Sequence, residues 1–321
     1  MPEIRAPRWR TFGIPTVLLL LSIITTTGIG ARFMQNYHDG LPLVAHESDL
    51  WPWPWLLQSP ARFLLGWPFS VALLSILLTH EFGHYIACRL HSVDCTLPWV
   101  LPAPTLSGTL GAIIRLRGRI PDRRVLIDIG VWGPIAGYVV SIAAAMIGMS
   151  LSLGHVTSYV HSSMEIVNFS PPSSLELLRS MMEHLFLAHR VHANVSVDPA
   201  VCHPILLAAW IGLFITSLNL IPCGQLDGGH ILYAISPHLH RIVSRVLPVV
   251  LLVAAWYCWV GWAVWGIILL IPAMRHPRVL GDAPPGAGRK MLAVFAMVIF
   301  ALTITSTPFP GNAIRDLFLS Q

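Results

Sequence analysis

Long apolar runs dominate this sequence, and they recur at the length needed to cross a lipid bilayer. A transmembrane helix needs about 20 consecutive, predominantly apolar residues. The clearest runs are 14–34, 63–88, 127–153, 204–222 and 290–307. A further apolar block, 245–273, could form either one tilted helix or two short helices that meet near Gly261. The sequence therefore predicts an all-α polytopic membrane protein with six to seven transmembrane helices.

The composition supports this interpretation. Hydrophobic residues make up 55% of the chain and charged residues only 11%, whereas a soluble domain carries about 25% charged residues. So few charges cannot cover a water-facing surface, which excludes a soluble enzyme, a disordered protein and a nucleic-acid binder. The 5 cysteines never occur as C-x-x-C, so we interpret them as small apolar residues and not as disulfide partners or thiolate ligands.

The basic residues predict how the chain is oriented. If the amino terminus is cytoplasmic and each run crosses once, the Arg-rich connection at 89–126 and a turn at 236–245 fall inside. The basic stretch 275–290 also falls inside, provided that 245–273 crosses twice. We therefore favour seven crossings. We expect an integral protein of the bacterial inner membrane. The first run is followed by no small-residue cleavage site, so we expect it to be retained as a span.

Two connections are predicted to be more than simple loops. The 154–203 connection contains an amphipathic stretch at 174–189, which we expect to lie on the membrane surface or to cap the bundle. The 97–119 connection is apolar but interrupted by proline and glycine. Irregular backbone at membrane depth is tolerated only inside protein or beside a wet cavity. We therefore expect a re-entrant, strand-like element there.

Two acidic residues, Glu81 and Asp227, lie inside strongly apolar runs. A buried carboxylate is costly, and such residues usually mark a functional site. Glu81 lies between His80 and His84, whose i, i+4 spacing places both imidazoles on one face of a helix. This pattern is typical of a zinc site in which the glutamate acts as a general base. The alternative is a polar patch that faces a neighbouring helix.

A hydrolytic zinc site needs a third protein ligand, which the segment NLIPCGQLDGGH, residues 219–230, can supply. Asp227 is our candidate, although it could also be the N-cap of a short helix. Asn219 could bind a substrate carbonyl or stabilise an oxyanion, or it could form an interhelical hydrogen bond. His230 could contact the metal ligands or the substrate. The histidines of the 154–203 connection, including His203, are expected to be surface residues.

HEFGH within a span, followed by NLIPCGQLDGG, resembles the site-2 protease family of intramembrane zinc metalloproteases. The segments PAPTLSGTLGAIIRLR, DIGVWGPIAGY, RHPRVL and STPFP are similar to its bacterial and chloroplast EGY-type branch, in the same order. The resemblance covers about residues 60–310. It implies Zn²⁺ held by His80, His84 and Asp227, with Glu81 as the base. We expect no PDZ or CBS domain.

The leading hypothesis is an intramembrane zinc endopeptidase that hydrolyses peptide bonds in or near transmembrane segments of membrane proteins. We expect one membrane-embedded metalloprotease domain over 1–321. It consists of a first span and outer loop at 14–62, a catalytic core at 63–236 and C-terminal spans at 237–321. The expected partners are transmembrane substrates and membrane lipid. The alternatives are a divalent-metal transporter, which uses the same His and Asp cluster, and a catalytically silent membrane scaffold.

Overall fold

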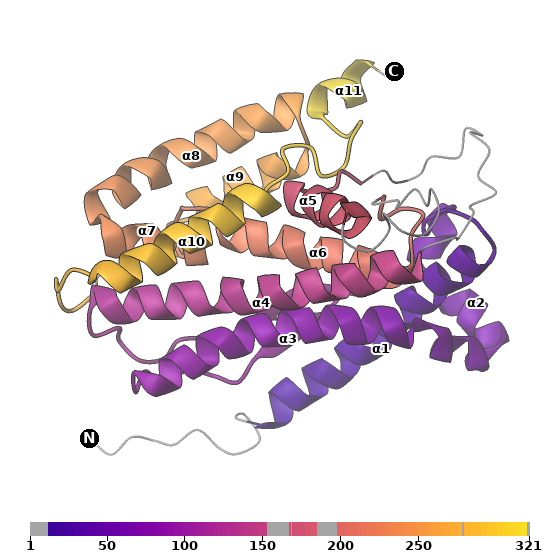
Figure 1. Ribbon diagram of the computed structural model, residues 1–321, viewed down its shortest axis with the longest axis horizontal. Coiled ribbons are helices and arrows are strands. Elements are labelled where there is room, and N and C mark those ends of the chain that lie inside the picture. Colours follow the sequence, from indigo (N-terminus) through magenta and orange to yellow (C-terminus); the bar gives the residue numbers. More distant parts are fainter. Residues whose placement is uncertain (1–11, 153–166, 168, 185–197, 278, 320–321) are drawn as a thin grey trace.

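The computed structural model describes residues 12–152, 167, 169–184, 198–277 and 279–319. Its long helices lie side by side in a stacked bundle (Figure 1). Short 3-10 helices occupy Glu47–Leu50, Pro60–Gly66 and Pro272–Met274. The other elements are α1 (Ile14–His38), α2 (Trp53–Gln58), α3 (Trp67–Leu90), β1 (Trp99–Pro102), β2 (Thr109–Ile113), α4 (Arg123–Leu151), α5 (Ser173–Met182), α6 (Pro204–Asn219), α7 (Asp227–Ile235), α8 (Pro237–Tyr257), α9 (Gly261–Leu270), α10 (Ala287–Thr303) and α11 (Ile314–Leu319).

Four stretches are long and apolar enough to cross a membrane: α1, Pro60–Leu90 (which contains α3), α4 and α8. The helical architecture of an integral membrane protein is therefore confirmed, whereas the number of crossings stays a prediction. The helix boundaries differ from the predicted ones for local reasons. Helix α4 begins at Arg123 because the Asp122 side chain accepts hydrogen bonds from the backbone N–H groups of Arg124 and Val125. Helix α6 ends at Asn219 because Pro222 disfavours further helix.

The block 245–273 forms parts of two helices, α8 and α9, separated by residues 258–260. Gly266 lets α9 approach α8 closely, because a Cβ there would lie 2.9 Å from the carbonyl oxygen of Pro248. The predicted turn at 236–245 was wrong, because these residues form the first turns of α8. Ser236 caps this helix by accepting a hydrogen bond from Leu239 N–H, and Pro237 occupies its first position.

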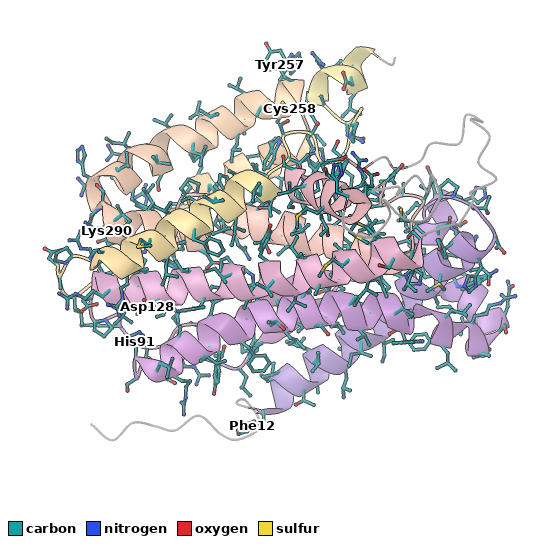
Figure 2. All side chains as sticks on the ribbon, in the orientation of Figure 1. Phe12, His91, Asp128, Tyr257, Cys258 and Lys290 are labelled. Atoms are coloured by element: carbon teal, nitrogen blue, oxygen red, sulfur yellow. The ribbon has the colours of Figure 1, made fainter. Side chains whose placement is uncertain are left out.

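The basic connections before α4 and before α10 lie at the same end of the molecule. Gly281 N–H donates to the carbonyl of Pro121 at 2.8 Å, and Arg123 Nη2 donates to the carbonyl of Asp282 at 2.9 Å. Figure 2 labels His91, Asp128 and Lys290 at this end. The chain runs away from this end in α8 and comes back to it after α9 (Figure 1), and the double crossing of 245–273 stays a prediction.

Asp128, on α4, links three elements at this end. Its carboxylate accepts hydrogen bonds from Arg289 Nε at 2.9 and 3.0 Å and from Arg289 Nη2 at 2.8 Å, and its Oδ2 lies 2.8 Å from His91 Nε2. Such forked pairing is the strong geometry for a guanidinium and a carboxylate. Arg289 therefore anchors α10 to α4, and Asp128 is a buried acid that the sequence did not single out.

The predicted strand-like element in 97–119 is confirmed as an antiparallel hairpin of β1 and β2, in which Val100 pairs with Ala112. Two hydroxyls of α1 hold it: Ser22 donates to the Val100 carbonyl at 3.2 Å and Thr25 to the Gly108 carbonyl at 2.6 Å. Gly108 has φ +75°, and a Cβ there would lie 2.7 Å from Thr26 Cα. The turn therefore requires glycine both for its conformation and for its approach to α1.

The described part of the predicted amphipathic stretch forms α5, which packs into the bundle. Its residues Leu175, Leu178 and Met182 are buried in the main apolar core. The same core contains Phe33, Phe69, Leu73, Leu206 and Leu207. Residues 185–189 of the stretch lie outside the described residues. The expectation that His203 is a surface residue was wrong. It is buried, and its Nδ1 accepts from Ile205 N–H at the start of α6. All five cysteines are free, as predicted.

Candidate metal centre

His80, Glu81 and His84 lie in the second half of α3 and are 4%, 6% and 5% exposed. The one-turn spacing brings the two imidazole rings to a centroid distance of 4.9 Å. The predicted shared face is therefore formed, and it is turned into the bundle. Two imidazoles in that position need a polar partner, because the surrounding positions of α3 are apolar.

Asp227 is this partner. Helix α6 ends at Asn219, the chain turns through residues 220–226, and Asp227 then opens α7. Its Oδ2 lies 3.2 Å from His80 Nε2 and 3.3 Å from His84 Nε2. The three ligand atoms all lie within 4.8 Å of one another. Two imidazole nitrogens and one carboxylate oxygen are the donor set of many hydrolytic zinc sites, so these residues fit that ion.

The two histidines are held by different contacts. His84 Nδ1 donates to the carbonyl of Ile129 at 2.7 Å, which fixes the ring with Nε2 directed at Asp227. His80 Nε2 lies 3.3 Å from the side-chain nitrogen of Asn219. The structure thus brings Asn219 to the cluster, as the sequence predicted. The Ile129 carbonyl was missed, because no sequence signal identifies a backbone acceptor on a neighbouring helix.

Glycines let α3 and α4 cross closely beside the histidines. A Cβ at Gly83 would lie 2.5 Å from the Trp132 carbonyl oxygen, and a Cβ at Gly133 would overlap the His84 imidazole. One at Gly137 would lie 2.9 Å from His80 Nδ1. The histidines therefore fill the space that missing side chains leave on α4. The glycine spacing in GVWGPIAGY was the sequence signal for this close helix crossing. The spacing alone did not identify the side chains that pack against the glycines.

Replacing Gly133 with alanine should weaken zinc binding and lower any activity of the site by about 10- to 100-fold or more, because His84 must move to admit the methyl group. Gly288→Ala is the matched control, since a Cβ at this helical position of α10 meets nothing within 4 Å. Zinc affinity of the purified variants checks the prediction. Wild-type affinity in Gly133→Ala would contradict it.

His230 is close to the cluster but is bonded elsewhere. His276 Nδ1 donates to the Pro277 carbonyl at 2.6 Å, so its Nε2 accepts from His230 Nδ1 at 2.8 Å. Burial, and then the neighbouring His230, lower the pKa of His276 to about 3, so this imidazole is neutral near pH 7. The Nε2 atom of His230 is therefore left as an acceptor. This supports a contact role for His230 and not a place among the three clustered ligands.

A cavity of about 210 Å³ surrounds these groups and is lined by Glu81, His230 and residues 112–114 at the end of β2, among others. A second cavity, of about 570 Å³, shares Ile113, Ile114, Leu116, Gln225 and His230 with it. The two cavities therefore adjoin at these residues, beside the end of the hairpin.

Comparison with known proteins gives a consistent result. Residues 68–258 match the model of Peptidase family M50. The chain is 30% identical over 318 residues to "Probable zinc metalloprotease EGY1, chloroplastic" of Arabidopsis thaliana, which covers 91% of this chain and 52% of that protein. It is 33% identical over 168 residues to the protein of the same name in Oryza sativa subsp. japonica, covering 51% of this chain and 27% of that protein.

The chain spans about half the length, or less, of the curated relatives it matches. The family match nevertheless includes α3 with both histidines, the close crossing with α4, and the turn that carries Asp227. It covers well over half of the chain and agrees with the resemblance to EGY-type site-2 proteases. On this evidence the chain belongs to Peptidase family M50.

Proposed function

We propose that the protein is an intramembrane zinc endopeptidase that hydrolyses peptide bonds in or near the transmembrane segments of membrane proteins. The observation that carries this proposal is the convergence of His80, His84 and Asp227 from α3 and α7 at one buried point. The names of the relatives support it. The divalent-metal transporter, our alternative for the same cluster, has no support from the family match.

In this proposal His80, His84 and Asp227 hold Zn²⁺, which supplies Lewis-acid activation of water and of a carbonyl. Glu81 accepts the proton of the attacking water and later transfers a proton to the leaving amine. The Asn219 amide lies beside His80 and donates a hydrogen bond to the substrate carbonyl oxygen as negative charge develops. His230 accepts a hydrogen bond from a substrate N–H through its free Nε2.

The β hairpin is the proposed binding surface for an unwound substrate. Helical segments hide their carbonyls in internal hydrogen bonds, so the substrate must become extended before it is cleaved. Strand β2 pairs only with β1 among the described residues, and residues 112–114 at its end line the cavity that contains Glu81. Addition of the substrate to this edge would place its backbone next to Glu81.

Metal analysis and a cleavage assay on the purified protein test the proposal together. We expect bound zinc, cleavage of a single-pass transmembrane substrate, loss of cleavage on removal of zinc by a chelator, and its recovery when zinc is added back. Zinc binding without cleavage of any transmembrane substrate would favour the transporter. Absence of bound metal would contradict both functions.

We further propose that the amino terminus and the basic end of the bundle are cytoplasmic, in a bacterial cell membrane. The clustering of the Arg-rich connections at one end of the molecule supports this orientation. Asp282 lies at that end and Arg315, on α11, at the other (Figure 1). On a cysteine-free background, a cysteine at 282 should resist an impermeant maleimide in intact cells, and a cysteine at 315 should react. The reverse pattern would contradict the orientation.

A further inference from the structure

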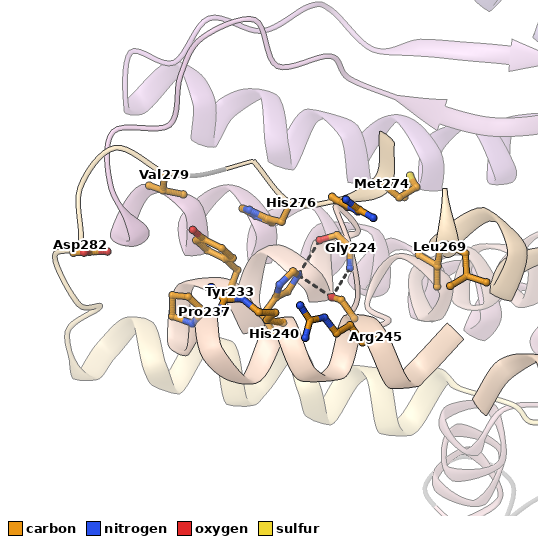
Figure 3. A pocket seen from close by; sticks show the side chains of 14 residues that line it. Gly224, Tyr233, Pro237, His240, Arg245, Leu269, Met274, His276, Val279 and Asp282 are labelled. Atoms are coloured by element: carbon orange, nitrogen blue, oxygen red, sulfur yellow. Dashed lines mark hydrogen bonds between the residues drawn. The ribbon is translucent and has the colours of Figure 1, made fainter. Parts of the chain in front are cut away.

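The largest cavity described lies outside the metal centre, between α7, α8 and the segment that follows α9. Its volume is about 750 Å³, within the usual range for small-molecule sites. Figure 3 shows His240 and Arg245 of α8 on one wall and Met274 and His276 on the opposite wall. None of the roles proposed above for the catalytic residues uses this cavity.

The charge of the cavity is strongly positive. Arg241, Arg245 and Arg275 line it, and Asp282 is its only acidic lining residue. No guanidinium among these three forms an ion pair with a carboxylate of the described residues. Arg241 and Arg245 are one turn apart on α8, an arrangement in which like charges repel. An anion between these side chains would relieve that repulsion.

The shape and the remaining lining indicate which anion fits. Guanidinium groups bind phosphate oxygens through two parallel hydrogen bonds, which favours a phosphate group as the ligand. The side of the cavity formed by Leu269, Leu270 and Met274 is apolar, so it suits a phosphate that carries an apolar substituent. The cavity is also at the start of α8, a helix long and apolar enough to cross the membrane.

We propose that this cavity binds a phosphate ester, presented by an anionic phospholipid whose headgroup contacts Arg241, Arg245 and Arg275 and whose glycerol and upper acyl region contact Leu269 and Leu270. Basic pockets between transmembrane helices on the cytoplasmic side bind anionic lipid headgroups in this way. The site goes beyond the proposed protease function and does not depend on it.

The cavity is connected to the metal centre by one hydrogen bond. His276 lines the phosphate cavity, and its Nε2 accepts from Nδ1 of His230, which lines the cavity around Glu81. Tyr233 stacks on His276, with ring centroids 4.0 Å apart and planes at 8°. A ligand that fixes Arg275 and the neighbouring His276 therefore also fixes the position of His230.

The test measures lipid binding directly, so that its result does not depend on catalysis. The full-length protein, in nanodiscs or detergent, is titrated with phosphatidylglycerol, with phosphatidylcholine as the neutral lipid and with inorganic phosphate as the soluble probe. Retained lipid is identified by native mass spectrometry. We expect a preference for phosphatidylglycerol that falls about tenfold or more in Arg241→Gln/Arg245→Gln. Arg245→Lys keeps the charge but cannot form the two parallel hydrogen bonds of a guanidinium, so its loss of phosphatidylglycerol binding should be intermediate.

Lys290→Gln is the matched control, because it removes an exposed cation from the same basic end of the bundle but outside the cavity. It should bind phosphatidylglycerol like the wild type, and all variants should unfold at similar temperatures. Tight binding of inorganic phosphate that depends on the same arginines would support the phosphate site and assign its ligand to the soluble phase. Equal lipid binding by the double variant and the wild type would overturn the proposal.

Discussion

Replacing Glu81 with glutamine is expected to lower proteolysis by about 10²- to 10⁴-fold while leaving the zinc content unchanged, since this is the range that a general base contributes. Glutamine keeps nearly the same shape but cannot accept the proton of the attacking water. Glu81 is not one of the three clustered ligand residues, so the metal should be retained. If the loss lies in the chemical step, kcat and kcat/KM should fall together.

Two controls make the Glu81 result specific. Glu176→Gln changes a partly exposed carboxylate on α5 that pairs with Arg179, and it should leave proteolysis near the wild-type rate. Thermal unfolding of Glu81→Gln should match the wild type or exceed it, because a buried charge is replaced by a neutral amide. Full proteolytic activity in Glu81→Gln would show that another group is the base.

The structure explains why the metal cluster could be predicted from the sequence. An acid inside a bilayer-length apolar run is costly enough to need a partner, and the i, i+4 histidines lie within the same helix. The helices themselves are also evident, because runs of about 20 apolar residues have few alternatives in a membrane. These signals are local in the chain, and the features that they predicted are present in the fold.

The features that were missed depend on pairs of residues far apart in the chain. Arg289 was interpreted only as a positive charge at the cytoplasmic side, whereas it binds Asp128 on another helix. The fit of Gly133 against His84 depends on where α4 crosses α3. The turn predicted at 236–245 was wrong because its arginines suggested a loop, although Ser236 and Pro237 are good helix-start residues. A single sequence shows hydrophobic periodicity and helix-capping residues. It does not show where two helices cross or which distant residues form a pair.

Replacing Asp227 with alanine should weaken zinc binding by more than about 100-fold and abolish proteolysis. Loss of a residue that only supports a ligand already costs about 10- to 100-fold, and here one of three direct ligands is removed. His80→Ala and His84→Ala should behave alike, because each also removes a ligand. Asp316→Ala, which changes a carboxylate on α11 that pairs with the adjacent Arg315, is the control and should bind zinc normally.

His230→Ala tests whether Asp227, and not the neighbouring His230, is the third ligand. The Nδ1 atom of His230 is bonded to His276, and His230 lies outside the cluster of His80, His84 and Asp227. We therefore expect His230→Ala to keep its zinc and to lose activity mainly through weaker substrate binding, seen as a higher KM. The opposite pattern would make His230 the third ligand: zinc lost in His230→Ala but retained in Asp227→Ala. In that case the carboxylate of Asp227 would only orient His80 and His84, whose Nε2 atoms lie 3.2 and 3.3 Å from its Oδ2.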